Sequence, residues 1–152
     1  MHIILWVKFA YLYAFYQLST LDAHILALWC LMEARKCKEK GINDLGVLDP
    51  TSIKEATVAF RSTVDAVCDA LLDMQDKKLI FLPYNHYNHH ILIEINLDKS
   101  KITIHDSKRL SQDLIQPCID MLNKAFAKYL KKAIEYIDLS GRISLYMMPN
   151  IS

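Results

Sequence analysis

The chain has 152 residues, of which 53% are hydrophobic and 23% are charged, and its formal net charge is +1. This length and composition are typical of one globular domain that buries a substantial core. A charge so close to neutral gives no electrostatic reason to expect a nucleic acid or a membrane as a partner, and we expect neither. The four cysteines form no C-x-x-C pair, so neither a zinc ribbon nor a secreted disulfide framework is predicted.

The first segment of the chain is strongly apolar, but the run at 9–16 is too short to cross a membrane. Apolar residues recur there at helical spacing, which predicts a short helix with one buried face made of Phe9, Leu12, Tyr13 and Tyr16. A second helix is predicted from Leu21 to about Lys40. Its expected buried stripe contains Leu21, Ile25, Leu28, Trp29 and Met32.

Two shorter helices are predicted next. Ser52 and Glu55 have the spacing of a capping box, which opens the first of them. The second begins at Ser62 or Thr63, and its expected buried face contains Val64, Val67, Cys68, Leu71 and Leu72. The first half of the chain is therefore expected to be helical.

The pattern then changes to that of β-strands. Residues 79–82 form a short apolar run that Pro83 is expected to stop. Residues 89–96 are rich in isoleucine, and residues 101–105 alternate between apolar and polar side chains across an intervening turn. These features predict three strands of one small sheet.

A long helix is predicted from Ser111, with Pro117 in its first turn or at a kink. Its expected core face contains Ile115, Cys118, Ile119, Leu122, Phe126, Tyr129 and Leu130. Four lysines gather on its other side, which we interpret as a solvated face: Lys124, Lys128, Lys131 and Lys132. Helices, then a hairpin-like sheet, then a helix predict the α+β class.

A histidine and an aspartate stand at the ends of two of the predicted strands. His89 opens one strand and Asp106 follows another. If these ends meet at one edge of the sheet, the carboxylate holds the imidazole in one tautomer and stabilises its protonated form. A thiol placed beside that imidazole would ionise to the reactive thiolate. The strand order therefore outlines two of the three groups of a cysteine-protease site.

Three blocks in this region resemble the ubiquitin-like-protein-specific (SUMO-type) cysteine protease family, most closely its plant, transposon-associated branch. They are Pro83-Tyr84-Asn85, His89-His90-Ile91-Leu92 and Asp106-Ser107-Lys108-Arg109. The resemblance implies an α+β, papain-like cysteine proteinase fold that is incomplete, in one partial domain over residues 1–152. It also implies a peptidase that processes or deconjugates ubiquitin-like proteins in the nucleus or cytoplasm, without a cofactor.

The resemblance assigns catalytic roles to His89, as general base, and to Asp106, as the acid that orients it. It places Asn85 and His90 along the substrate groove, where His90 replaces the family's tryptophan and alters the aromatic wall. The family continues to a glutamine of the oxyanion hole and a Cys-Gly block with the nucleophile, and neither is found before Ser152. We therefore expect an inactive peptidase fragment; the alternative is a non-catalytic remnant or binding module that keeps part of the groove.

Cys118 is a possible substitute nucleophile, because it follows Asp106 and has Gln116 two positions earlier. It falls on the apolar stripe of the last helix, however, so we expect a core residue instead. The chain then lacks an attacking atom for covalent acyl transfer.

Histidines near the predicted strands also have the chemical types of a metal site: His86, His89, His90 and His105, with Asp106. Their spacing matches no standard zinc pattern, and adjacent residues of a strand point to opposite faces of the sheet. No metal site is therefore predicted.

Overall fold

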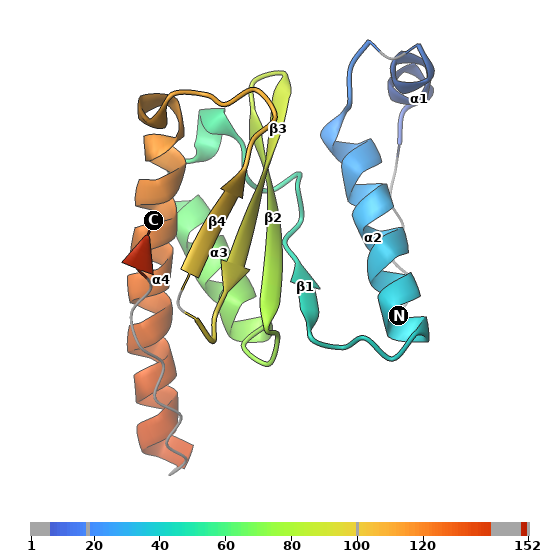
Figure 1. Cartoon of the computed structure of the whole chain (residues 1–152). Helices are drawn as coiled ribbons and strands as arrows, with labels where there is room; N and C mark the ends of the chain where they lie inside the picture. Colours follow the sequence, from blue (N-terminus) through green and yellow to red (C-terminus); the bar gives the residue numbers. More distant parts are fainter. Residues whose placement is uncertain (1–6, 18, 100, 141–149, 152) are drawn as a thin grey trace.

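The computed structural model describes residues 7–17, 19–99, 101–140 and 150–151 (Figure 1). Over these residues the strands form one sheet in the order β1-β2-β3-β4-β5, with helices on both sides. The elements are α1 (Phe9–Tyr16), α2 (Ala23–Glu39), β1 (Leu45–Val47), the 3-10 helix η1 (Glu55–Thr57), α3 (Arg61–Asp73), β2 (Leu79–His86), β3 (His89–Asn96), β4 (Lys101–His105), α4 (Gln112–Ser140) and β5 (Asn150–Ile151).

The centre of the sheet is the antiparallel meander of β2, β3 and β4, and β1 runs parallel to β2. The β2–β3 hairpin closes on the pair His86 and His89, so only Tyr87 and Asn88 form its turn. Tyr87 has φ of 53°, in the left-handed region that a tight hairpin turn of this length requires. The predicted strands at 89–96 and 101–105 are confirmed, and the short turn fixes His89 as the first residue of β3.

The prediction that Pro83 ends its strand is wrong, because β2 continues to His86. Backbone groups along a strand point alternately to its two neighbours. Phe81 accepts a hydrogen bond from Leu48 and Asn85 donates one to Ile53, so the nitrogen of Pro83 points to that same side. β1 pairs only as far as Phe81, so no ladder hydrogen bond is lost at the proline.

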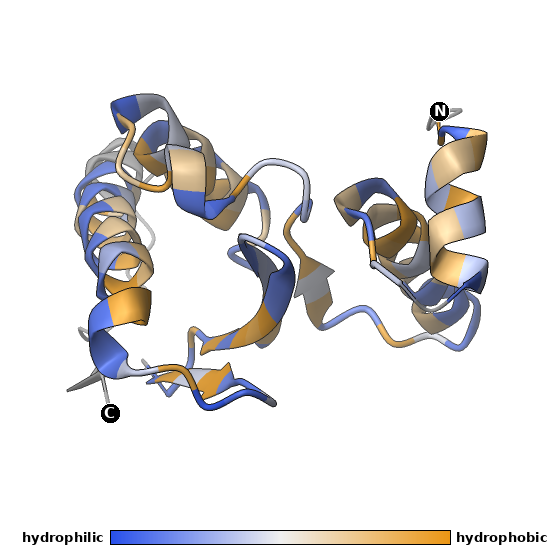
Figure 2. Cartoon of the chain, turned by 90° about the horizontal axis from the view of Figure 1, so that it is seen from above, coloured by the Kyte–Doolittle hydropathy of each residue, from blue (hydrophilic) through white to orange (hydrophobic). Residues whose placement is uncertain are grey.

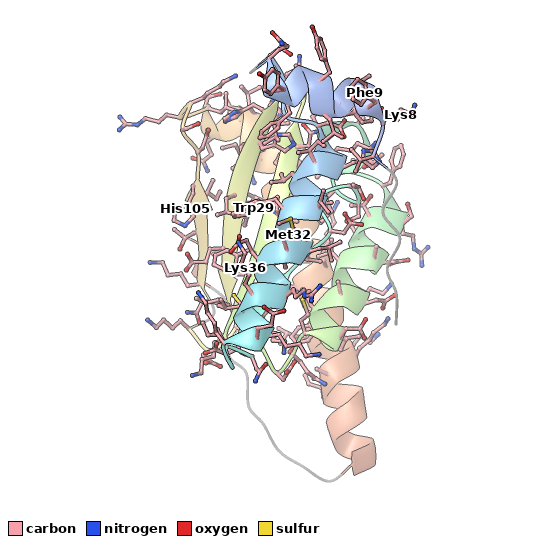
Figure 3. The ribbon with its side chains drawn as sticks, turned by 90° about the vertical axis from the view of Figure 1, so that its right-hand side faces the viewer. Lys8, Phe9, Trp29, Met32, Lys36 and His105 are labelled. Atoms are coloured by element: carbon pink, nitrogen blue, oxygen red, sulfur yellow. The ribbon has the colours of Figure 1, made fainter. Side chains whose placement is uncertain are left out.

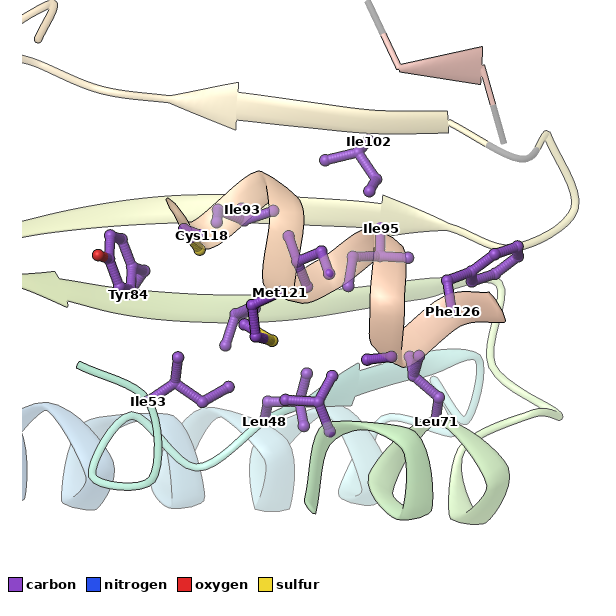
Figure 4. Packing of buried hydrophobic residues seen from close by; sticks show 14 of the residues in the cluster. Leu48, Ile53, Leu71, Tyr84, Ile93, Ile95, Ile102, Cys118, Met121 and Phe126 are labelled. Carbon is purple, nitrogen blue, oxygen red and sulfur yellow. The ribbon is translucent and has the colours of Figure 1, made fainter. Parts of the chain in front are cut away.

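Helices α3 and α4 cover one face of the sheet and enclose the core (Figure 4). The predicted buried face of α3 is confirmed at Val67, Cys68 and Leu71. The sheet supplies Ile80, Leu82, Tyr84, Ile91, Ile93 and Ile95 to this core, and α4 supplies Ile115, Cys118, Met121, Leu122, Ala125, Phe126 and Tyr129. The core face predicted for the last helix is therefore confirmed at Ile115, Cys118, Leu122, Phe126 and Tyr129.

Two ion pairs join α3 to α4 at the rim of this core. Lys128 pairs with Asp65, and Lys132 donates to Asp69 at 2.8 Å. All four side chains are at least one-third exposed, so water and salt screen both pairs and each contributes little to stability. The lysine-rich side of α4 is thus partly paired with acidic residues of α3 and not solely solvated.

Helix α1 forms where the sequence predicts it, but its predicted buried face is wrong. None of its residues is buried, and Phe9 is 81% exposed. Viewed from above, α1 and α2 form a pair beside the sheet, apart from α3 and α4 (Figure 2). Tyr11 stacks on His24 of α2, with the ring centroids 5.8 Å apart, while Phe9, Leu12, Tyr13 and Tyr16 stay exposed.

Helix α2 buries its predicted stripe only at Ile25. Its buried residues are Ile25, Ala27 and Cys30, whereas Trp29 is 58% and Met32 is 51% exposed. Figure 3 shows this helix from its solvent-facing side, with Trp29 and Met32 labelled. In the first half of α2 its own apolar residues lie on every side of the helix. The spacing of apolar residues therefore does not indicate which face packs beside β1.

The predicted capping box is wrong as well. The hydroxyl of Ser52 donates to the carbonyl of Asp49 at 2.7 Å, within the preceding turn. The helix that follows is the one-turn 3-10 helix η1, and Lys54 precedes it without a side-chain cap. Because Ser52 is used by the turn, it does not start an α-helix.

Candidate active site

The hairpin and the end of β4 bring His89 and Asp106 together at one edge of the sheet. His89 is the first residue of β3, and Asp106 directly follows β4. Nε2 of His89 lies 2.5 Å from Oδ1 of Asp106. Their side chains are only 12% and 7% exposed, so this hydrogen bond is largely shielded from water.

The carboxylate of Asp106 is held by the turn that follows it. Its Oδ1 accepts from the amide of Lys108 at 2.9 Å, and its Oδ2 accepts from the amide of Leu110 at 2.6 Å. Arg109 adopts φ of 51°, which bends the backbone around the carboxylate. Removal from water raises the pKa of Asp106, but the hydrogen bonds from His89, Leu110 and Lys108 outweigh this effect and lower its pKa to about 2. Asp106 is therefore ionised at neutral pH.

The position of Asp106 decides which nitrogen of His89 is available for chemistry. An ionised carboxylate only accepts hydrogen bonds, so Nε2 of His89 carries the proton that it donates to Asp106. In the neutral ring, Nδ1 then has the free lone pair. A thiol placed at Nδ1 would transfer its proton there, and Asp106 would stabilise the imidazolium that forms.

Asn85 and His90 face the opposite side of the sheet from the core. They are direct cross-strand partners in the β2–β3 register, and strand alternation puts His90 on the other face from His89. His90 lines a cavity of about 690 Å³ between α2 and the sheet. Burial and then the neighbouring His89 lower the pKa of His90, against a smaller opposite effect of Asp22, so the ring is neutral. The four site residues predicted from the sequence thus form two neighbouring pairs on different faces.

No pattern in the sequence indicates the cavity itself. Its walls come from α2, through Leu26 and Trp29, and from the strands, through Phe81 and Leu92. These segments are more than 40 residues apart in the chain, so no local pattern connects them.

Comparison with known protein families decides how the His89–Asp106 pair should be interpreted. Residues 51–148 match the Ulp1 protease family, C-terminal catalytic domain. The chain belongs to this family. The Ulp1 match includes Asn85, His89, His90 and Asp106, whereas α1 and α2 precede it. No curated protein gives a significant match to the chain.

Membership of the Ulp1 family confirms the predicted relationship to SUMO-type cysteine proteases. Together with the helices and the mixed sheet, it also confirms the predicted α+β, papain-like fold class. The plant, transposon-associated branch and the truncation of the domain stay predictions. Residues 141–149 and 152 lie outside the described part of the chain.

None of the chain's four cysteines is placed to serve the Ulp1-family histidine. All four are described, and no thiol among them is hydrogen-bonded to His89. Cys118 lies in the core close to Tyr84 and Ile93, with no exposed surface (Figure 4). Burial raises the pKa of its thiol to about 12, so very little of it is thiolate at neutral pH. The expectation that Cys118 is a core residue is confirmed.

This placement predicts a wide spread of thiol reactivity. With a disulfide reagent at neutral pH, we expect Cys37 to react first, because it alone among the cysteines is not buried. Cys118 should react at least about 100-fold more slowly, because it is both inaccessible and un-ionised. Mass spectrometry of the modified peptides over time measures both rates, with Cys37→Ser as the control. Rapid modification of Cys118 in the folded chain would contradict its assignment to the core.

The described residues contain no group of three or more His, Cys, Asp or Glu side chains arranged to hold a metal ion. Across the same part of the chain, every helix is too short or too polar to span a bilayer.

Proposed function

We propose that this chain carries the histidine–aspartate half of a cysteine-peptidase site for processing or deconjugating ubiquitin-like (SUMO-type) proteins, and that the 152-residue chain is itself catalytically inactive. The observation that carries the proposal is the shielded 2.5 Å hydrogen bond between His89 and Asp106 in a domain of the Ulp1 family.

The chemistry that such a pair serves is the activation of a thiol. Nδ1 of His89 takes the proton of the thiol, and the thiolate attacks the carbonyl carbon of the isopeptide or peptide bond. The imidazolium then returns its proton to the leaving amine, and water releases the acyl group from sulfur. Asp106 keeps the imidazole oriented and stabilises its charge in both steps.

The proposed lack of activity follows from the positions of the thiols. Cys30, Cys68 and Cys118 are buried, and burial raises the pKa of each. Cys37 is on α2, at the end of the cavity on the other face of the sheet from His89. Without a thiol beside Nδ1 of His89, no acyl-enzyme forms.

The partner that we propose is a ubiquitin-like protein, inside the cell in the nucleus or the cytoplasm. Asn85 and His90 would lie along the groove for its tail. A binding module that keeps this groove is the second candidate, and the apolar cavity beside His90 favours it.

A SUMO-type protein with an electrophilic group at its C-terminus tests the proposal. We expect no covalent adduct with the chain in denaturing gel electrophoresis, and saturable non-covalent binding by calorimetry. His89→Ala should leave the adduct absent, and so should the matched control His105→Ala, which changes an exposed histidine at the end of β4.

Two results would overturn the proposal. An adduct that His89→Ala abolishes and His105→Ala retains would show that the chain is an active peptidase. If neither an adduct nor binding were observed, a ubiquitin-like protein would not be the partner of this chain.

A further inference from the structure

Most of the exposed apolar side chains in the described part of the chain lie on or beside α1 and the first half of α2. Among the described residues, sixteen large apolar side chains are at least 38% exposed, and ten of them lie between Phe9 and Met32. The other six are scattered over the rest of the chain. Helix α1 has no charged residue and none of its residues is buried, whereas a helix that is apolar on all sides is ordinarily covered. This surface is therefore suited to contact with another molecule.

The two helices form one structural unit. The ring of Tyr11 on α1 stacks on the ring of His24 on α2, and the two planes are within 10° of parallel. Asp22 caps α2 by accepting a hydrogen bond from the amide of His24 at 2.8 Å. Figure 3 views the molecule from the side on which both helices lie, with Phe9 and Trp29 labelled. We call the ten exposed apolar side chains of this unit the α1–α2 surface.

The α1–α2 surface is large enough for a stable interface. Five of its ten side chains are aromatic and are 48–81% exposed: Phe9, Tyr13, Phe15, Tyr16 and Trp29. At about 200 Å² for each fully exposed side chain, these five present roughly 650 Å², whereas the largest apolar patch of a typical monomer is about 300–600 Å². A homodimer of standard interface size takes about 800 Å² from each partner, of which about 65% is apolar. The aromatic side chains alone therefore expose as much apolar area as one partner has to provide.

The charge of the α1–α2 surface favours a second copy of the chain as its partner. In a two-fold interface the same patch meets itself, so a charge at its centre faces a like charge. Between Phe9 and Met32, Asp22 is the only Asp, Glu, Lys or Arg, and its carboxylate already accepts from the amide and lies 2.8 Å from the ring of His24. The surface thus has no charge pattern that would select an acidic or a basic partner, and none that would oppose self-association.

We propose that two copies of the chain form a dimer with two-fold symmetry. In this dimer, α1 and the side of α2 that carries Trp29 and Met32 pack against the same surface of the other copy. The inference goes beyond the proposed function, because α1 and α2 precede the residues that match the Ulp1 family. It assigns to this N-terminal unit a role in assembly that is separate from the chemistry of the His89–Asp106 pair.

Sedimentation equilibrium of the 152-residue chain tests the proposal directly. At loading concentrations from about 1 to about 100 μM, we expect the mass to approach twice 17.6 kDa and to rise no further. The dissociation constant of the dimer should be below about 10 μM.

Charged substitutions show whether the α1–α2 surface is the interface. Tyr16→Glu and Trp29→Glu each place one carboxylate on each copy in the interface, so each should raise the dissociation constant at least about 100-fold. Both side chains are more than half exposed, so the monomer should keep its fold, which circular dichroism checks. Ile134→Glu is the matched control. Ile134 lies on α4 and is 58% exposed, as Trp29 is, and its substitution should change the dissociation constant less than about twofold.

Three outcomes would overturn the inference. A constant mass of 17.6 kDa over the whole range would show that a second copy does not cover the surface. A mass that keeps rising with concentration would indicate open-ended association and not a closed dimer. A dimer that Tyr16→Glu and Trp29→Glu leave intact would have its interface elsewhere. Because none of these measurements involves the electrophilic probe, their failure leaves the proposed function to be judged separately.

Discussion

Replacing Asp106 by alanine is expected to lower the free energy of unfolding by about 2–4 kcal/mol. The carboxylate accepts hydrogen bonds from His89, Lys108 and Leu110, and its side chain is only 7% exposed. Its loss leaves the imidazole and two amides without this acceptor. Urea unfolding followed by circular dichroism measures the change. Asp98→Ala, at an exposed position in the turn between β3 and β4, is the matched control and should cost less than about 0.5 kcal/mol.

The dependence of stability on pH gives this prediction a second readout. The pKa of Asp106 in the folded chain, about 2, lies below its usual value of 3.8. Its contribution to stability is therefore present above about pH 4 and is lost as the pH falls through 2. Asp106→Asn should lose less stability over this interval than the unaltered chain. Identical pH profiles would show that the carboxylate is not held as described.

Replacing Ile93 by alanine is expected to cost about 2–5 kcal/mol. Ile93 is fully buried in the middle of β3 and lies between the sheet and α4, near Cys118 (Figure 4). Its register partners are Leu82 on β2 and Ile104 on β4, so the cavity left by the substitution would open at the centre of the meander. Thermal and urea unfolding both measure the loss.

The neighbouring position provides a matched control. Leu92 is on the opposite face of the same strand and is 38% exposed. Leu92→Ala should therefore cost about 1 kcal/mol or less. Similar losses at the two positions would mean that the α2 side of the sheet is as well packed as the α4 side, and the cavity assigned there would be wrong.

The part of the site that carries the proposed chemistry could be predicted from the sequence. His89 and Asp106 stand at the two ends of the strands predicted at 89–96 and 101–105. Because β3 and β4 pair in antiparallel register, with Leu92 opposite His105, the start of β3 and the end of β4 lie at the same edge of the sheet. The role of Cys118 could be predicted for a similar reason, because the amphipathic pattern of α4 already places it on the core face.

The sequence by itself determined the elements with strong periodicity: β3, β4, α3, α4 and the His89–Asp106 edge that they support. Only the tertiary structure decided which sides of α1 and α2 are covered and that β2 continues beyond Pro83. It alone also showed that His90 lines a cavity and that its Nε2 has no hydrogen-bond partner among the described residues. Periodicity reports whether a residue can face a core, but a uniformly apolar helix has no preferred side. The partners of Trp29, Pro83 and His90 come from distant segments, so their surroundings exist only once the chain has folded.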